Sequence, residues 1–371
     1  SDELQDTENQ VEFVPGSMKG SKQEETSENE EQGQTEQSRQ TVAEENDAEQ
    51  AKTAGNLEVH FIDVGQGDAT LIKCDGHSML IDAGNNDKGT LVQNYLQHQG
   101  VETLDYVIGT HPDADHIGGM DVVLYKFDCK TIIMPDVANN TRTYDDVVQT
   151  MKNKGYKTTY PVVGETYTIG GAAFTIIAPN KEYGNDMNSW SVGVLLQNGN
   201  HRFLFTGDAE EGAEQDILQN GIDISADVYK VAHHGSNTAT SQAFLDAVHP
   251  TYAVISAGEG NSYGHPHAEV LNRLRAAGVS VFRTDEQGTI VAASDGTTLT
   301  WNMSPSESWQ AGEAKKSQNT EKSEKAADSQ NNAETDAAVS NPTDQTDGNS
   351  DVIVHITKTG EKYHSAGCQY L

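Results

Sequence analysis

The stretch Thr110-His111-Pro112-Asp113-Ala114-Asp115-His116-Ile117-Gly118-Gly119 decides how the rest of the chain is interpreted. Two His and two Asp, all able to bind a metal ion, follow an apolar run at 106–109 that predicts a buried strand. Imidazole nitrogens and carboxylate oxygens are ligands for Zn²⁺ and similar divalent ions. Without a cation, the crowded carboxylates would repel one another. The stretch therefore predicts a metal centre, and a polar loop with incidental charges is the alternative.

The composition predicts one folded domain between polar tails. The chain has 371 residues and a net charge of −33. Residues 1–56 are acidic and residues 304–350 are similarly polar, and both nearly lack periodic apolar residues, so we expect both to be disordered. The folded domain is expected at 57–303, which leaves a short C-terminal segment at 351–371.

The charge of the folded domain limits its partners. Residues 57–303 contain 31 acidic and 14 basic side chains, a net charge of −17. This balance counts against broad binding to nucleic acid through a basic patch. The negative charge does not exclude a metal centre that binds a single phosphate group of DNA, because bound cations change the local field.

The sequence also bears on location. No run of about 18 apolar residues is present, so no transmembrane segment is expected. The Gln- and Glu-rich leader that begins at Ser1 is typical of a chain whose signal peptide or lipid anchor has been removed. It predicts an extracellular or cell-surface protein, associated with the surface through its N-terminus, and a trimmed boundary is the alternative. Three cysteines form no disulfide framework, although a Cys74–Cys129 bridge is compatible with an oxidising compartment.

Strand and helix patterns fall into two blocks. The first begins with strands at 57–64, 69–73 and 78–81 and continues with alternating helices and strands. The second runs from a strand at 192–197 to strands at 281–283, 290–293 and 299–301. Two such blocks predict an α/β (α+β) fold in which two mixed β-sheets pack together and helices flank both outer faces.

Further ligands are expected at other strand ends. Asp208 follows an apolar strand at 203–206 and a glycine, where its two oxygens could bridge two ions. His233 and His234 end a strand predicted at 228–232, so their side chains should point to opposite sides, one into the site and one beside it. His265 and His267 lie in a Gly-rich loop, and we favour His265 as the ligand that completes a second ion's shell.

This ligand set predicts a mechanism. Two divalent ions, Zn²⁺ or Mn²⁺, would lower the pKa of a bound water to near neutrality, and the metal-activated hydroxide would attack phosphorus or a carbonyl carbon. The second ion and a nearby His would stabilise the developing charge. The candidate catalytic residues are Asp115, His233 and His234. Supporting or substrate-binding roles are expected for Asp82, Asp68, Gln66, Asn188, Ser236, Tyr263 and His267.

Six segments together resemble the metallo-β-lactamase-fold hydrolases. They are FIDVGQGD (61–68), LIDAG (80–84), THPDADHIGG (110–119), FTGDA (205–209), AHHGS (232–236) and YGHPH (263–267). They look most like the branch that includes the extracellular hydrolase domain of ComEC-type competence (DNA-uptake) proteins. The match covers about residues 57–303, and the family's αββα sandwich agrees with the two blocks.

The resemblance implies a role for each matching residue. Asp82 would be the first Asp of the family's motifs and Asp208 the bridging carboxylate, with His265 as the late ligand. The central ligand motif would consist of His111, Asp113, Asp115 and His116. Most members of the family have His where this chain has Asp113. The ComEC-type branch has the same His-to-Asp change.

A second departure weakens one metal site. The family usually has a further His before the bridging carboxylate, but residues 188–191 (Asn-Ser-Trp-Ser) occupy that region here. One of the two metal sites is therefore expected to have more oxygen ligands and to bind its ion more weakly. Such a centre could hold Mn²⁺, or it could hold only one Zn²⁺ tightly. His233 or His234 could replace the missing imidazole.

The C-terminal segment carries a separate half-motif. Residues 352–371 predict a short strand followed by His364 and Cys368, which could form half of a zinc site. The segment resembles the start of small zinc-binding modules appended to similar secreted hydrolases, truncated before their later Cys pair. A leftover hydrophobic end is the alternative.

Three functions are compatible with these residues. The leading one is an exported metal-dependent hydrolase of phosphodiesters, DNA among them. A lactone or amide (β-lactam-type) hydrolase acting on a small molecule would use the same site; the acidic domain favours it and the oxygen-rich ligands count against it. A non-catalytic, metal-stabilised cell-surface binding module is the third. Fold alone does not identify the substrate.

Overall fold

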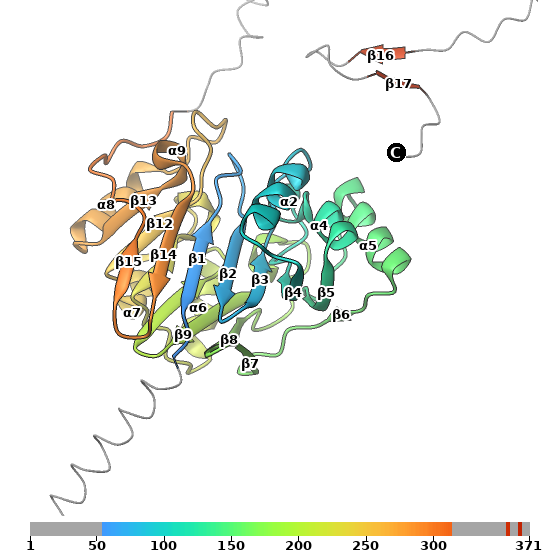
Figure 1. Ribbon diagram of the computed structural model, residues 1–371. Coiled ribbons are helices and arrows are strands. Elements are labelled where there is room, and N and C mark those ends of the chain that lie inside the picture. The colour runs from blue at the N-terminus through green and yellow to red at the C-terminus, as the bar shows by residue number, and fades with distance from the viewer. Residues whose placement is uncertain (1–53, 314–353, 357–362, 366–371) are drawn as a thin grey trace, which may run out of the picture. The chain divides into compact units, whose positions relative to one another are not determined.

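The computed structural model describes residues 54–313, 354–356 and 363–365 (Figure 1). The chain separates into two compact units, Ser1–Lys316 and Ser317–Leu371. In the second unit, β16 (Val354–Ile356) pairs antiparallel with β17 (Tyr363–Ser365), and His364 is the cross-strand neighbour of His355. Cys368, the predicted N-terminal tail up to residue 53 and the predicted linker from residue 314 lie outside the described residues.

The first unit contains two mixed sheets. The first sheet has the spatial order β15 (Leu299–Trp301), β14 (Ile290–Ser294), β1 (Leu57–Phe61), β2 (Thr70–Cys74), β3 (His77–Ile81), β4 (Thr103–Ile108), β5 (Asp128–Ile133) and β6 (Thr158–Thr159). The second has the order β13 (Ser280–Arg283), β12 (Tyr252–Ile255), β11 (Val228–Lys230), β10 (His201–Phe205), β9 (Gly193–Asn198), β8 (Ala172–Ala178) and β7 (Thr166–Ile169). Strands β3 to β6 are parallel, and so are β10 to β13.

Helices cover the outer face of each sheet. On the first sheet lie α2 (Gly89–His98), α4 (Met120–Lys126) and α5 (Arg142–Lys154), which Figure 1 shows grouped beside β2 to β5. On the second lie α6 (Glu211–Gln219), α7 (Gln242–Val248) and α8 (Ala268–Ala276). The short helices are α3 (Ala114–Ile117), η1 (Asn188–Trp190), η2 (Ala232–Gly235) and α9 (Thr284–Gln287). This αββα sandwich confirms the predicted fold class.

Alternation along the strands builds the core between the sheets. Leu57, Val59 and Phe61 alternate along β1 and are buried in that core. Phe61 stacks on Phe205 of β10, with ring centroids 6.2 Å apart. The apolar faces therefore bring the ends of β1 and β10 together, and the loops after both strands carry predicted site residues.

Three expectations differ from the structure. The sequence order places the last strands in the second block, but β14 and β15 join the first sheet through β1. The predicted linker begins at residue 304, yet Trp309 and Ala311 pack against the second sheet's core and Ser306 N–H donates to the Val281 carbonyl at 2.7 Å. Cys74 and Cys129, compatible with a disulfide, are buried free thiols.

Candidate metal centre

The predicted site residues of the cluster lie in loops that follow five strands. Asp68 follows β1, Asp82 follows β3, and residues 111–116 follow β4 in the first sheet. Asp208 follows β10, and His234 follows β11 in the second sheet. The carboxyl ends of parallel strands meet at the same edge of a sheet, where α/β proteins place their sites. The sandwich therefore brings side chains from both sheets to one place.

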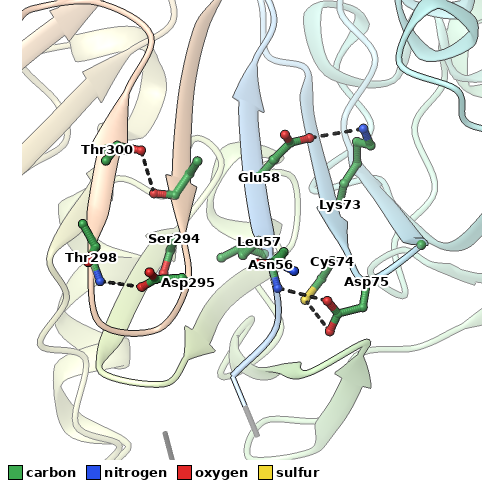
Figure 2. A pocket seen from close by; sticks show the side chains of 12 residues that line it. Asn56, Leu57, Glu58, Lys73, Cys74, Asp75, Ser294, Asp295, Thr298 and Thr300 are labelled. Carbon is green, nitrogen blue, oxygen red and sulfur yellow. Dashed lines mark hydrogen bonds and ion pairs between the residues drawn. The ribbon is translucent and has the colours of Figure 1, made fainter. Parts of the chain in front are cut away.

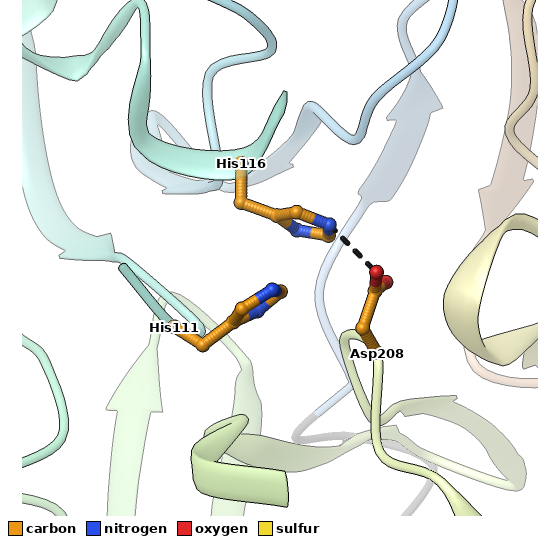
Figure 3. A group of neighbouring side chains, drawn as sticks. All are labelled: His111, His116 and Asp208. Carbon is orange, nitrogen blue, oxygen red and sulfur yellow. Dashed lines mark ion pairs between the residues drawn. The ribbon is translucent and has the colours of Figure 1, made fainter. Parts of the chain in front are cut away.

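Three of these side chains form the centre of the cluster (Figure 3). His111, His116 and Asp208 are all buried, and each offers one ligand atom within 4.8 Å of the others. His116 Nε2 lies 3.1 Å from Asp208 Oδ1. A second group of three, at the same spacing, consists of Asp115, His116 and His234. The two groups share His116, so the ligand atoms form one continuous set.

Hydrogen bonds behind the three imidazoles determine which nitrogen carries a proton. His116 Nδ1 donates to Asp82 Oδ2 at 2.8 Å, and His234 Nδ1 donates to the carbonyl oxygen of Ser256 at 3.0 Å. Behind His111, the Thr110 and Ser191 hydroxyls lie 3.1 and 3.3 Å from Nδ1.

Both hydroxyls already donate elsewhere, Thr110 to Asp82 and Ser191 to the Asn188 carbonyl. Toward His111 they can therefore act only as acceptors, so Nδ1 carries the hydrogen and donates the hydrogen bond. In the neutral form, all three rings present an Nε2 lone pair to the cluster, as metal-ligating histidines do.

The atoms that face one another in the cluster lack hydrogen-bond partners. Among the described residues, His111 Nε2, His116 Nε2, His234 Nε2 and Asp208 Oδ1 are buried and make no hydrogen bond, although His116 Nε2 and Asp208 Oδ1 lie close enough to form an ion pair. Buried polar atoms of this kind are rare because each one loses its contacts with water without compensation. Divalent cations at the two groups would satisfy all four atoms, so the donor set fits the metal centre that the sequence predicts.

The charges of the cluster are strongly perturbed. Burial lowers the pKa of His111 to about 3, and the neighbouring His116 acts in the same direction. Burial also opposes the charge of His234, but the carboxylates of Asp208 and Asp68 outweigh it and raise the pKa of His234 to about 10. Asp208 and Asp82 likewise outweigh burial and raise the pKa of His116 well above its ordinary value.

The pKa values of two carboxyl groups, those of Asp208 and Asp115, are lowered. Burial opposes the ionisation of Asp208, yet His116 and His234 hold the pKa of this carboxyl well below its usual range. Burial also opposes the ionisation of Asp115, but the His234 imidazole, whose Nε2 lies 3.2 Å from Asp115 Oδ2, and the His116 imidazole outweigh it and lower the pKa of Asp115 to about 2. Metal binding at such imidazoles would replace their Nε2 protons.

Two predicted ligands lie beside the groups of three. Asp113 Oδ2 is 3.7 Å from His111 Nε2, and the Asp113 side chain is 39% exposed. The His265 ring centroid is 6.1 Å from that of His234. Among the described residues neither belongs to a group of three ligand atoms within 4.8 Å, so their ligand roles stay predictions.

Other predicted supporting residues contact His265 or residues close to His233 and His265. Gln66 lies between His265 Nδ1 and the Gly258 N–H, while Tyr263 is 63% exposed and stacks on the His265 ring at 5.5 Å. His267 accepts from the Asn237 N–H, and its other nitrogen lies 3.2 Å from the Tyr263 carbonyl, so both of its nitrogens are engaged. Asn188 donates to Glu210, and the Ser236 hydroxyl lies 2.9 Å from that of Thr238.

The His233-His234 pair does not have the extended conformation that the sequence predicts. Strand β11 ends at Lys230, and both histidines lie in η2 with left-handed backbone, φ 49° and 53°. Gly235 continues this turn at φ 83°, and a Cβ there would lie 2.6 Å from Pro266 Cβ. The left-handed turn brings both rings toward Asp208: His234 Nε2 is 3.5 Å and His233 Nε2 3.6 Å from Oδ2.

Several residues that sequence reasoning missed complete the site. Thr110 and Ser191 hold the His111 ring, and Ser191 also accepts from the Asp208 N–H at 3.0 Å. Glu210 lies 3.3 Å from His233 Nδ1, and Lys230 pairs with Asp68 at 2.7 Å. Serine and threonine at strand ends give no sequence signal of their own. Glu210, two residues after Asp208, could have been considered.

Replacing Asp82 tests the orientation of His116. Asp82 is buried and accepts from His116 Nδ1, from the Thr110 N–H and from the Thr110 hydroxyl, each at 2.8 Å. Its φ of 58° is also accessible to Asn, so Asp82→Asn should fold. The loss of the carboxylate should weaken metal binding by roughly 10–100-fold. Chelator competition measures this, with the exposed Asp246→Asn as control; wild-type affinity would exclude the role of Asp82.

A cavity of about 520 Å³ lies away from the metal centre, near the beginning of β1 (Figure 2). Its charged side chains pair within the cavity wall: Lys73 with Glu58 at 3.2 Å, and Asp75 with the Asn56 N–H at 3.0 Å. None of its lining side chains is among the buried unpaired atoms of the described residues. It therefore lacks the convergent free donors that mark the metal centre.

Comparisons with known proteins agree with the geometry. A family model described as "Metallo-beta-lactamase superfamily" matches residues 62–259. ComE operon protein 3 of Bacillus subtilis is 31% identical over 255 residues, which cover 63% of this chain and 32% of that protein. Recombination protein 2 of Haemophilus influenzae is 33% identical over 238 residues, 63% of this chain and 28% of that protein. The chain thus spans about a third of the length of these curated relatives.

A solved structure covers a similar region. The metallo-beta-lactamase fold protein YhfI from Bacillus subtilis aligns with a TM-score of 0.44 and 13% identity, covering 64% of this chain and 100% of that chain.

Proposed function

The chain belongs to the metallo-β-lactamase superfamily, and from this premise we propose that it is a hydrolase that uses two bound divalent ions to cleave phosphodiesters. Superfamily membership supports metal-dependent hydrolysis, and the similarity to ComE operon protein 3 agrees with the ComEC-type resemblance of the six motifs. Zn²⁺ and Mn²⁺ both suit the mixed nitrogen and oxygen donors.

One observation carries the proposal: four buried donor atoms face one another without hydrogen-bond partners. His111, His116 and Asp208 Oδ1 would hold one ion. Asp115 and His234 would hold the other, with Asp208 Oδ2 as the bridging ligand. When bound, such ions supply a water of lowered pKa and polarise the bond to be cleaved.

His233 is the side chain placed to move a proton at the mouth of the site. Its side chain is 21% exposed, and its Nε2 lies 3.6 Å from Asp208 Oδ2. Glu210 Oε1, 3.3 Å from Nδ1, orients the ring from behind and is itself held by Asn188 and Thr238. A carboxylate-oriented imidazole of this kind can protonate a leaving alkoxide. His233 would therefore donate a proton to the leaving group, and its neighbour His234 would bind a metal ion.

The chemistry of the donors favours phosphodiesters over amides. Asp208 and Asp115, with Asp113 beside them, make the cluster rich in carboxylate oxygen, and residues 188–191, before the bridging carboxylate, offer no imidazole. The domain's net charge of −17 gives DNA no broad basic face to bind. We therefore propose that DNA, if it is the substrate, is held mainly through the phosphate at the ions.

A substrate comparison tests the proposal. With Mn²⁺ or Zn²⁺ supplied, the protein should hydrolyse bis(p-nitrophenyl) phosphate and short single-stranded oligonucleotides, and leave a chromogenic cephalosporin intact. His233→Gln should slow the oligonucleotide reaction by roughly 10²–10⁴-fold, because an alkoxide needs a proton to leave.

The same substitution should slow the p-nitrophenyl ester much less, since p-nitrophenolate leaves without one; the exposed His98→Gln is the matched control. Turnover of the cephalosporin alone would replace the proposal with amide hydrolysis. Metal binding without turnover of any substrate would favour a binding module.

The predicted location concerns residues outside the described part of the chain. No helix in residues 54–313 is long and apolar enough to cross a membrane. Export and attachment to the cell surface stay predictions from the composition of residues 1–56.

A further inference from the structure

Lys230 is a buried lysine at the end of β11, directly before the turn that carries His234. Its side chain is 3% exposed, and its Nζ lies 2.7 Å from Asp68 Oδ2 and 3.2 Å from the Val231 carbonyl. Asp68 is also buried, 162 residues earlier in the chain. Removing both charges from water is costly, so a buried pair requires an explanation. This pair joins the two sheets at the metal centre.

The backbone of Asp68 is held on both sides. Its N–H donates to the carbonyl of Asp115 at 3.0 Å, and its own carbonyl accepts from the Gly84 N–H at 2.8 Å. These bonds fix Asp68 relative to the loop that carries Asp115. Lys230 then fixes the direction of the carboxylate by holding Oδ2.

The free oxygen of this carboxylate lies behind His234. Asp68 Oδ1 is 3.3 Å from His234 Nδ1, and it is one of the buried atoms without a hydrogen-bond partner. His234 Nδ1 donates to the Ser256 carbonyl, and Nε2 on the opposite edge faces Asp115 Oδ2 at 3.2 Å. The imidazole is thus placed between a fixed carboxylate and the proposed ligands of the second ion.

We infer that Lys230 is a positioning residue for the second metal ion, acting through Asp68 and His234. Lys230 holds the Asp68 carboxylate behind the ring, and the carboxylate keeps Nε2 directed at the ion shared with Asp115 and Asp208. The inference rests on the proposed metal centre and deepens it. A carboxylate behind a ligating histidine fixes the ring and strengthens it as a ligand.

A purely structural role for the pair predicts something different. Two apolar side chains of similar volume can replace a buried ion pair with little change in stability, whereas removing one partner leaves an uncompensated charge. If the pair only joined the sheets, the apolar double variant would bind metal as the wild type does. If Lys230 acts through His234, the same variant folds and loses the second ion.

The test uses the full chain with metal binding as the readout. Lys230→Met/Asp68→Leu and the single variant Asp68→Asn are compared with wild type, with folding checked by circular dichroism. Zn²⁺ or Mn²⁺ is titrated in chelator buffers, and bound metal is counted by elemental analysis. The matched control is Arg283→Met/Asp285→Leu, which removes another buried ion pair. In that pair Arg283 Nη2 lies 2.6 Å from Asp285 Oδ2, and Arg283 also donates a hydrogen bond to the Gln310 carbonyl.

Both test variants should keep one ion at wild-type affinity and bind the second roughly 10–100-fold more weakly. The control should bind both ions normally. Wild-type affinity for two ions in either folded test variant would overturn the inference and leave the proposed function standing. Two ions in the wild type without turnover would contradict the proposed function alone. Fewer than two ions in the wild type would overturn both.

Discussion

Asp208→Asn is expected to abolish metal-dependent hydrolysis. Its Oδ1 lies 3.1 Å from His116 Nε2, and its Oδ2 lies 3.5 Å from His234 Nε2, so one carboxylate faces both groups of ligands. Asparagine has nearly the same shape but offers one neutral oxygen instead of two charged ones. Loss of a side chain that merely supports a ligand costs about 10–100-fold in metal affinity or activity. Loss of the bridging ligand itself should therefore cost more than about 100-fold.

Metal content and kcat/KM for bis(p-nitrophenyl) phosphate measure this effect together. Asp246→Asn is the control. Asp246 is exposed on α7, and within the described part of the chain its side chain accepts a hydrogen bond from Gln242 alone. The account requires Asp208→Asn to lose bound metal along with turnover. Full activity at wild-type metal content would exclude the bridging role.

Gly67→Ala should strongly destabilise the fold and disrupt the site. Gly67 has a φ of +143°, and a Cβ there would lie 2.4 Å from the carbonyl oxygen of Asp115. That carbonyl accepts the Asp68 N–H at 3.0 Å, so neither partner can move without shifting a proposed ligand. Backbone strain costs about 1–3 kcal/mol, and overpacking costs about as much again. The expected loss of about 2–6 kcal/mol is a large part of a typical domain's stability.

Gly76→Ala is the matched control for this substitution. Gly76 also has a positive φ, +82°, but a Cβ there would meet no heavy atom within 4 Å beyond its chain neighbours, so only the strain remains. Urea unfolding should show a clearly larger loss for Gly67→Ala, and only this variant should lose metal affinity. Equal losses in the two variants would show that the contact with the Asp115 carbonyl is unimportant.

The sequence predicts the sandwich and most of the central cluster. Alternating apolar residues, as in β1, mark which strand face enters the core, and the ligands follow strand ends where backbones converge. His111, His116 and Asp208 could be identified because imidazoles and carboxylates immediately after apolar runs have few structural explanations. The structure places all three in one buried group.

Long-range contacts account for what the sequence does not predict. Strand patterns specify a face but not a partner, so nothing in residues 290–301 indicates that β14 pairs with β1. Lys230 and Asp68 are 162 residues apart, and each alone resembles an ordinary polar residue at a strand end. His233 and His234 have a left-handed backbone and precede a close approach of Gly235 to Pro266, a long-range contact that local propensity does not describe.

Metal analysis joined to a phosphodiesterase assay tests the central claim most directly. The purified chain is analysed for bound metal and assayed with bis(p-nitrophenyl) phosphate, then treated with EDTA and resupplied with Zn²⁺ or Mn²⁺. The account predicts two ions per chain, turnover that is lost with EDTA, and recovery when metal is returned. A chain that binds no metal, or whose turnover is unaffected by removing it, would contradict the account.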